Sequence, residues 1–93
     1  MPAAGTYVFK HSQFSHKGAT YDVSAYQKPG DTRFYVIAEQ GGIAVVFTYP
    51  DGYRASIEYS VEPVIAVDFQ RATGNSAVDA LMSTAEADVI RMI

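Results

Sequence analysis

The chain has 93 residues, of which 48% are hydrophobic, and a formal net charge of −3 at neutral pH. This length suits a single domain that can bury a core without covalent cross-links. The lack of cysteine excludes disulfides, thiolate zinc sites and cysteine nucleophiles, and it favours a reducing compartment. No run approaches the ~18 apolar residues of a membrane-spanning helix, and no leader pattern opens the chain. We therefore expect a soluble, cytoplasmic protein.

The charge is unevenly distributed along the chain. Residues 1–33 carry four cations and two carboxylates, whereas residues 34–93 carry three arginines and eight carboxylates. Net acidity disfavours binding to duplex nucleic acid, which depends on neutralising phosphates. Residues 1–5 are small and uncharged, and we expect them to form a flexible tail.

From residue 6 to residue 70 the pattern is that of an antiparallel sheet. Residues 49–53 join two runs that alternate apolar and polar, residues 43–49 and 53–59. Pro50 presets the backbone of a turn, and Gly52 can adopt the left-handed conformation that closes a three-residue loop. The predicted β-hairpin pairs Tyr49 with Tyr53, Phe47 with Ala55, Val45 with Ile57, and Ile43 with Tyr59.

Two further turns extend this hairpin into a meander. A two-residue turn at Gly41-Gly42 pairs Gln40 with Ile43, Val36 with Phe47, and Phe34 with Tyr49. An even-length loop at Pro29-Gly30 pairs Ala25 with Phe34, Val23 with Val36, and Tyr21 with Ala38. The three hairpins agree on one apolar face, which predicts a core made of Tyr21, Val23, Ala25, Phe34, Val36, Ala38, Ile43, Val45, Phe47, Ala55 and Ile57.

The two ends of the meander are predicted from shorter patterns. Residues 6–11 predict a first strand with Tyr7 and Phe9 inward, followed by an irregular segment over residues 12–18. Residues 64–69 are β-branched and apolar, and with Pro63 at their start they predict a sixth strand. The sheet then has five to six strands.

From residue 75 the apolar residues recur at helical spacing. The stripe predicts an amphipathic helix over residues 75–93, formed by Val78, Leu81, Met82, Ala85, Val89, Met92 and Ile93. Asn75 or Ser76 can cap its start, and Ser83-Thr84 could interrupt it. We expect one helix packed across the apolar sheet face. The fold class is then α+β in a single domain: an antiparallel β-meander with one C-terminal helix.

No motif assigns chemistry to this chain. Strand alternation places His11 inward and His16 outward, so the two histidines are not expected to share a metal ion. Pro2 could act as an amine base once Met1 is removed, but residues 3–5 do not form the apolar strand that such enzymes place there. Nucleophile, phosphate-loop and metal-helix motifs are absent. We therefore predict no catalytic residue, no metal and no cofactor, which favours a non-catalytic protein.

The best candidate is the second face of the sheet. The predicted registers place Tyr26 beside Arg33, Ser24 beside Tyr35, and Ile37 beside Val46. Tyrosine and arginine are enriched at binding hot spots. The predicted binding residues are Tyr26, Arg33, Tyr35, Ile37, Val46 and Arg54, on a face that also holds Asp22, Ser24 and Thr48. The alternative is a solvated face that uses tyrosine and valine because they favour strands.

Three functions follow from this sequence. The first is a small binding module that contacts a protein partner, or a second copy of itself, through the second sheet face or a free edge strand. The second is single-stranded nucleic-acid binding through Tyr26, Tyr35 and Arg33 with Lys28. The third is a small-ligand binder or enzyme with a pocket between helix and sheet.

Overall fold

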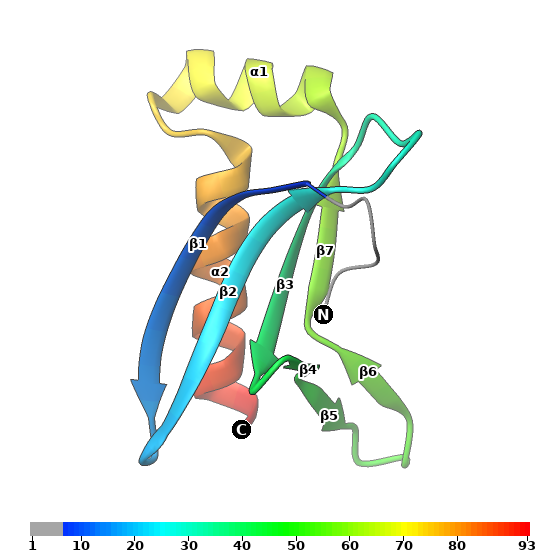
Figure 1. Cartoon of the computed structure of the whole chain (residues 1–93), viewed down its shortest axis with the longest axis vertical. Helices are drawn as coiled ribbons and strands as arrows, with labels where there is room; N and C mark the ends of the chain where they lie inside the picture. The colour runs from blue at the N-terminus through cyan, green and yellow to red at the C-terminus, as the bar shows by residue number, and fades with distance from the viewer. Residues whose placement is uncertain (1–6) are drawn as a thin grey trace.

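The computed structural model describes residues 7–93 and shows an α+β fold (Figure 1). The predicted tail over residues 1–5 lies outside this range. The elements are β1 (Tyr7–His16), β2 (Ala19–Gln27), β3 (Phe34–Gln40), β4 (Ile43–Ala44), β5 (Val46–Thr48), β6 (Arg54–Ser56), β7 (Glu58–Val61), α1 (Pro63–Thr73) and α2 (Ala77–Met92). The predicted fold class, an antiparallel sheet with a C-terminal helix packed on it, is confirmed.

The sheet is built around β3. This strand pairs with β2 on one side, and on the other side with β4 and then with β7. β5 and β6 form a separate two-stranded ribbon that leaves the sheet (Figure 1). Three backbone hydrogen bonds of 3.0 Å tie its base to β3: Val45 donates to Ala38, Ile57 donates to Val45, and Ala38 donates to Ile57.

The ribbon contains the predicted hairpin. Phe47 lies opposite Ala55, Tyr49 donates its N–H to the carbonyl of Tyr53 at 2.7 Å, and Gly52 adopts a φ of 93°. The predicted register of this hairpin is therefore confirmed from the turn back to Val45 and Ile57, but not at Ile43 and Tyr59. Because Gly52 also donates its N–H to Tyr49 at 2.9 Å, the turn is closed by the backbone itself.

The predicted neighbours of β3 are partly wrong. Gln40 pairs with Ile43 as expected, but Val36 lies opposite Tyr59 rather than Phe47. Phe34 lies opposite Val61 rather than Tyr49, and Ile43 does not pair with Tyr59. Alternation fixes the face that a residue occupies, but it does not say which later strand lies beside β3.

The register of β2 against β3 is shifted by two residues from the predicted one. Val36 lies opposite Ala25, and Ala38 lies opposite Val23. The Asp31 N–H bonds to the Lys28 carbonyl at 3.1 Å and closes the turn at Pro29-Gly30, but the Asp31 carboxylate then accepts the N–H of Arg33 at 2.9 Å, so residues 31–33 stay in the loop and do not pair with β2. This longer loop delays the start of β3 to Phe34. Since the shift is even, the core residues keep their face.

The predicted irregular segment over residues 12–18 is wrong, because β1 continues to His16 and turns at Lys17-Gly18. Both turn residues have positive φ, 51° and 79°, as a tight hairpin requires. A bulge between Val8 and Lys10 reverses the alternation beyond it. His11 is therefore on the second sheet face beside Asp22, and His16 pairs with Ala19 on the α2 face, the opposite of the prediction.

The predicted sixth strand over residues 64–69 is also wrong, because these residues belong to α1. Pro63 occupies the start of the helix, where its missing N–H costs no hydrogen bond. Gly74 ends the helix with a φ of 78° and donates its N–H to Gln70 at 2.8 Å. These two end signals outweigh the strand preference of the β-branched residues between them. The sheet thus ends at Val61, not at residue 70.

α2 lies across one face of the sheet as a single helix (Figure 1). The Ser76 hydroxyl accepts the N–H of Asp79 at 3.1 Å, which confirms the predicted cap. The Thr84 hydroxyl donates to Ala80 within the helix, so the possible break at Ser83-Thr84 does not occur. No helix within residues 7–93 is long and apolar enough to cross a membrane.

The core lies between α2 and the sheet. Its buried residues are Tyr21, Val23, Ala25, Val36, Ala38, Val45, Ile57, Val78, Met82, Ala85 and Val89. Phe34 and Phe47, predicted for the core, are partly buried and pack against it, and Ala55 is half-buried. Ile43 is the exception at 75% exposed, because it lies opposite the exposed Gln40 at the end of the sheet.

Candidate functional site

The second sheet face does not have the predicted pairs. Tyr26 lies opposite Tyr35 rather than Arg33, and Ser24 lies opposite Ile37 rather than Tyr35. The Tyr26 and Tyr35 rings are stacked, with centroids 5.4 Å apart and an interplanar angle of 19°. The two tyrosines therefore support each other instead of flanking a guanidinium group.

Two of the predicted binding residues on this face are buried. Tyr26 is 4% exposed and Ile37 is 8% exposed. Burial, and then the nearby Glu58 carboxylate, raises the pKa of Tyr26 to about 12. Side chains with so little free surface have little area to offer a partner.

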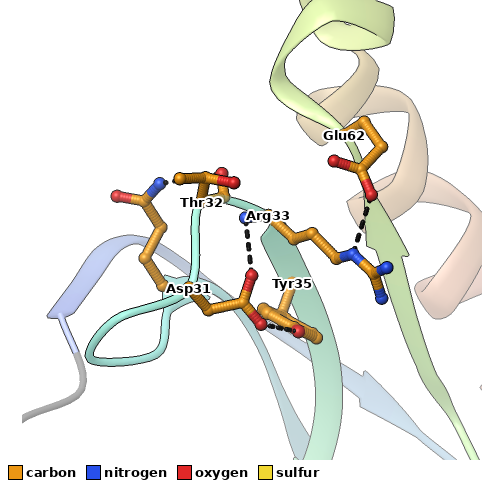
Figure 2. Close-up of polar contacts among 6 residues, drawn as sticks. Asp31, Thr32, Arg33, Tyr35 and Glu62 are labelled. Carbon is orange, nitrogen blue, oxygen red and sulfur yellow. Dashed lines mark hydrogen bonds and ion pairs between the residues drawn. The ribbon is translucent and has the colours of Figure 1, made fainter.

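Arg33 and Tyr35 already have partners in the chain (Figure 2). Arg33 Nε donates to Glu62 Oε1 at 2.7 Å, which ties the loop before β3 to the residue that precedes α1. The Tyr35 hydroxyl donates to the Asp31 carboxylate. These contacts raise the pKa of the Arg33 guanidinium and of the Tyr35 hydroxyl, and the Tyr35 hydrogen bond lowers the pKa of Asp31.

Lys28 completes this cluster, with its Nζ 4.4 Å from the centroid of the Tyr35 ring. Cations and carboxylates alternate in the cluster, so it has no strong charge of one sign. Figure 2 shows that its contacts link the β2–β3 loop to the strand that leads into α1. The cluster thus connects the loop before β3 to the residue that precedes α1, with two cations and two carboxylates.

Val46 and Arg54, the last two predicted binding residues, lie on the β5–β6 ribbon. Val46 pairs with Ser56, and Arg54 pairs with Thr48, so Val46 is not beside Ile37 as predicted. Both side chains are exposed. The six predicted residues therefore fall in three places: the second sheet face, the loop before β3 and the ribbon. Whether any of them binds a partner stays a prediction.

The structure has a different candidate, an apolar cleft where α1 meets the sheet and the start of α2. Its volume is about 330 Å³. The walls are aromatic and aliphatic: Phe9, Phe34, Pro63, Ala66, Val67 and Val78. Its polar residues are Lys10, Gln70, Ser76 and Asp79. We call it the α1 cleft.

Two features of the backbone build the α1 cleft. The bulge in β1 adds Phe9 as an extra residue in the strand, and its ring packs edge-on against Phe34 with centroids 5.6 Å apart. On the opposite wall, the helical turn that begins at Pro63 brings Ala66 and Val67 to the cleft. Neither the bulge nor α1 was predicted, which is why sequence reasoning missed this site. The signal for α1 was the proline and glycine spacing at Pro63 and Gly74.

The polar groups of the α1 cleft are largely paired with each other. Lys10 forms an ion pair with Asp79, and the Ser76 hydroxyl accepts the Asp79 N–H. No nucleophile with an adjacent base lines the cleft. Elsewhere in residues 7–93, no three histidine, aspartate or glutamate side chains gather in a way that could hold a metal ion. The α1 cleft is thus suited to hold an apolar group.

Apolar surface continues beyond the α1 cleft. Val67 on the cleft wall is exposed, and on β1 the exposed Tyr7 ring stacks on Phe9 with centroids 6.1 Å apart. Val64 and Ile65 are exposed as well, but on the sides of α1 that helical spacing turns away from the cleft. Exposed apolar residues in one small region often mark an interaction surface. A comparison with known protein families, curated proteins and solved structures finds no match to this chain. The function must therefore be argued from this geometry.

Proposed function

We propose that this protein is a non-catalytic interaction module that binds an apolar segment of a protein partner in the α1 cleft. The observation that carries the proposal is an apolar cleft whose own polar groups are paired with each other. An apolar side chain can enter such a cleft without leaving a buried charge unpaired.

The exposed residues beside the α1 cleft favour a polypeptide over a small molecule. A volume of about 330 Å³ is near the lower end of the range for small-ligand pockets. A small ligand that fills it would leave the exposed Tyr7 ring, which stacks on Phe9 of the cleft, in water, whereas an apolar peptide could cover the cleft and Tyr7 together. The cysteine-free sequence is the reason to expect this module in the cytoplasm.

Single-stranded nucleic acid is the weaker alternative. Of the residues predicted for that role, Tyr26 is buried and Arg33 and Tyr35 are bound to carboxylates. A nucleic acid would have to displace Glu62 and Asp31 before its phosphates or bases could use these side chains.

A peptide-display selection against the whole chain tests the proposal. Selected peptides should have apolar residues at helical i, i+3 and i+4 spacing. The Val67→Asp variant should bind them at least about tenfold more weakly, a change of about 1.4 kcal/mol in binding free energy. The matched control is Ile43→Asp, which places the same charge at an exposed apolar position on β4, outside the lining of the α1 cleft.

Equal binding by the parent and Val67→Asp would exclude the α1 cleft as the site. Loss of binding in Ile43→Asp alone would move the site to the far end of the sheet. If the selection returns no peptide while labelled single-stranded oligonucleotides bind in a salt-dependent way, the nucleic-acid alternative replaces the proposal.

A further inference from the structure

Within residues 7–93, β1 pairs only with β2, so the other side of its backbone is a free sheet edge (Figure 1). β1 has 10 residues, which at 3.3 Å per residue make an edge of about 33 Å. Residues 7–13 along it are all exposed. Proteins usually shorten or cover such edges, because their unpaired N–H and C=O groups can pair with another strand.

We propose that two copies of this chain pair through β1 in antiparallel orientation, with Ser12 of one copy directly opposite Ser12 of the other. The pair is related by a two-fold axis, so each copy contributes the same surface. It joins the two sheets into one and leaves both α2 helices on the same face. This goes beyond the proposed function, because it uses the edge of β1 and not the α1 cleft.

The side chains of β1 are complementary in this register. On the second sheet face, His11 lies opposite Gln13 of the second copy. On the α2 face, Lys10 lies opposite Phe14, whose ring can be covered by the lysine stem and its ammonium group. No two like charges are directly opposite, and the bulge between Val8 and Lys10 lies outside the five central residues of the pairing.

A carboxylate on α2, that of Glu86, favours this register over its neighbours. α2 packs mainly on β2 and β3, and two lysine side chains connect it to β1. Lys10 bonds to Asp79 near one end and Lys17 Nζ donates to the Ile93 carbonyl at 3.0 Å at the other, so α2 and β1 run in the same direction. Asp79 and Ile93 are about 21 Å apart along the helix axis, and Lys10 and Lys17 are about 23 Å apart along the strand. Glu86, halfway along this part of α2, is therefore level with Gln13 and Phe14.

Lys10 of the second copy, which forms an ion pair with Asp79 of its own chain, would lie opposite Phe14 and so at the level of Glu86, where its ammonium group meets a second carboxylate. Glu86 has no ion-pair partner within the described chain. It lines a cleft of about 300 Å³ between β1 and α2 together with Lys10, Ser12, Asp79, Met82 and Ser83. Because β1 is the edge strand, the second copy would lie beside this cleft.

Neighbouring registers are less favourable. A two-fold axis at Gln13 would bring Lys10 of the second copy opposite His16 and to the level of Arg91, where the charges repel. An axis at His11 would place two histidines opposite each other and bring the bulge into the pairing. The charges thus favour Ser12 as the central residue.

A single introduced thiol tests this register, because the natural chain has no cysteine. Directly opposed residues of an antiparallel pair have Cα atoms about 4.5 to 5.5 Å apart, within the range of a disulfide. In a glutathione redox buffer, Ser12→Cys should form a covalent dimer. Gln13→Cys on the same strand and Thr20→Cys on β2 should stay mostly monomeric. Preferential cross-linking of Gln13→Cys would overturn the register.

Sedimentation velocity tests the association without a cross-link. The parent should sediment as a dimer, and Ser12→Lys, which places two like charges on the axis, should shift it to monomer with an unchanged circular dichroism spectrum. Thr20→Lys adds the same charge away from the edge and should remain a dimer. A monomeric parent at millimolar concentration, or a dimeric Ser12→Lys, would overturn the proposal. Val67→Asp should leave the dimer intact, so a failure here is distinguishable from a failure of the α1 cleft.

Discussion

Tyr26 and Tyr35 lie directly opposite each other on β2 and β3 with their rings stacked, and only Tyr26 is buried. Tyr26→Ala should therefore lower the free energy of unfolding by about 3 to 5 kcal/mol, as for other buried aromatic residues. Tyr35→Ala should cost less, near the 0.5 to 1.5 kcal/mol of an aromatic pair. Chemical denaturation measures both losses. Equal losses would mean that the Tyr26 side chain is not more deeply buried in the folded protein than the Tyr35 side chain.

The burial of Tyr26 also changes what can be expected of the second sheet face. The sequence predicted both tyrosines to be surface residues, so that replacing them would spare folding. Alternation correctly placed them on the face opposite α2, but it could not show that one of them is buried there. Burial on a face depends on twist, curvature and neighbouring strands, and these are properties of the whole sheet.

The parts of the fold that were predictable are those set by local signals. Turn residues fixed the hairpin at Pro50–Gly52, helical spacing fixed α2, and the Ser76 cap fixed its start. The core residues were predictable from alternation because register shifts by an even number leave a residue on the same face. Most of the predicted core is indeed buried, with Ile43 as the clear exception.

The parts that were not predictable depend on single irregular residues or on distant strands. One extra residue in β1 reversed the position of His11, and the tight turn at Lys17-Gly18 reversed that of His16. Pro63, read as the start of a strand, is the first residue of α1. The α1 cleft depends on both irregularities, since Phe9 comes from the bulge and Val67 from the helix. Ile37 and Val46 are not neighbours as predicted, because pairing of β3 with β7 left Val46 and Arg54 on a separate ribbon.

Ile57 and Ile43 provide a matched test of the core. Both were predicted to point inward, but Ile57 is 1% exposed and Ile43 is 75% exposed. Ile57→Ala should lower the free energy of unfolding by about 2 to 5 kcal/mol. Ile43→Ala should change it by no more than about 0.5 kcal/mol. Urea denaturation with similar m-values for both variants measures the difference. A large cost at Ile43 would show that the end of the β3–β4 hairpin is packed.

Gly52 tests the hairpin turn. Its φ of 93° lies in a region that L-residues rarely adopt, and a β-carbon there would meet no atom within 4 Å. A substitution should therefore cost conformational energy without a steric clash. Gly52→Val should destabilise the protein more than Gly52→Asn, because asparagine tolerates positive φ better than a β-branched residue. If denaturation midpoints of the two variants coincide, the turn does not hold Gly52 in this conformation.

Tyr59 and Asp88 predict how stability depends on pH. The Tyr59 hydroxyl donates to Asp88, whose other carboxylate oxygen accepts from Arg91 at 2.8 Å. Burial, and then Asp88, raises the pKa of Tyr59 to about 12, and the hydrogen bond from Tyr59, followed by Arg91, lowers the pKa of Asp88. Between about pH 10 and pH 12 the unfolded chain loses a proton that the folded chain keeps, so the free energy of unfolding falls as pH rises. At acid pH the stability from Asp88 is lost as the pH falls below the ordinary range of a carboxylate and through the lowered pKa.

Tyr59→Phe should make both declines shallower in urea denaturation across pH, whereas Tyr53→Phe, at an exposed position, should reproduce the parent curve. Parallel curves for the parent and Tyr59→Phe would show that this hydroxyl is not linked to folding.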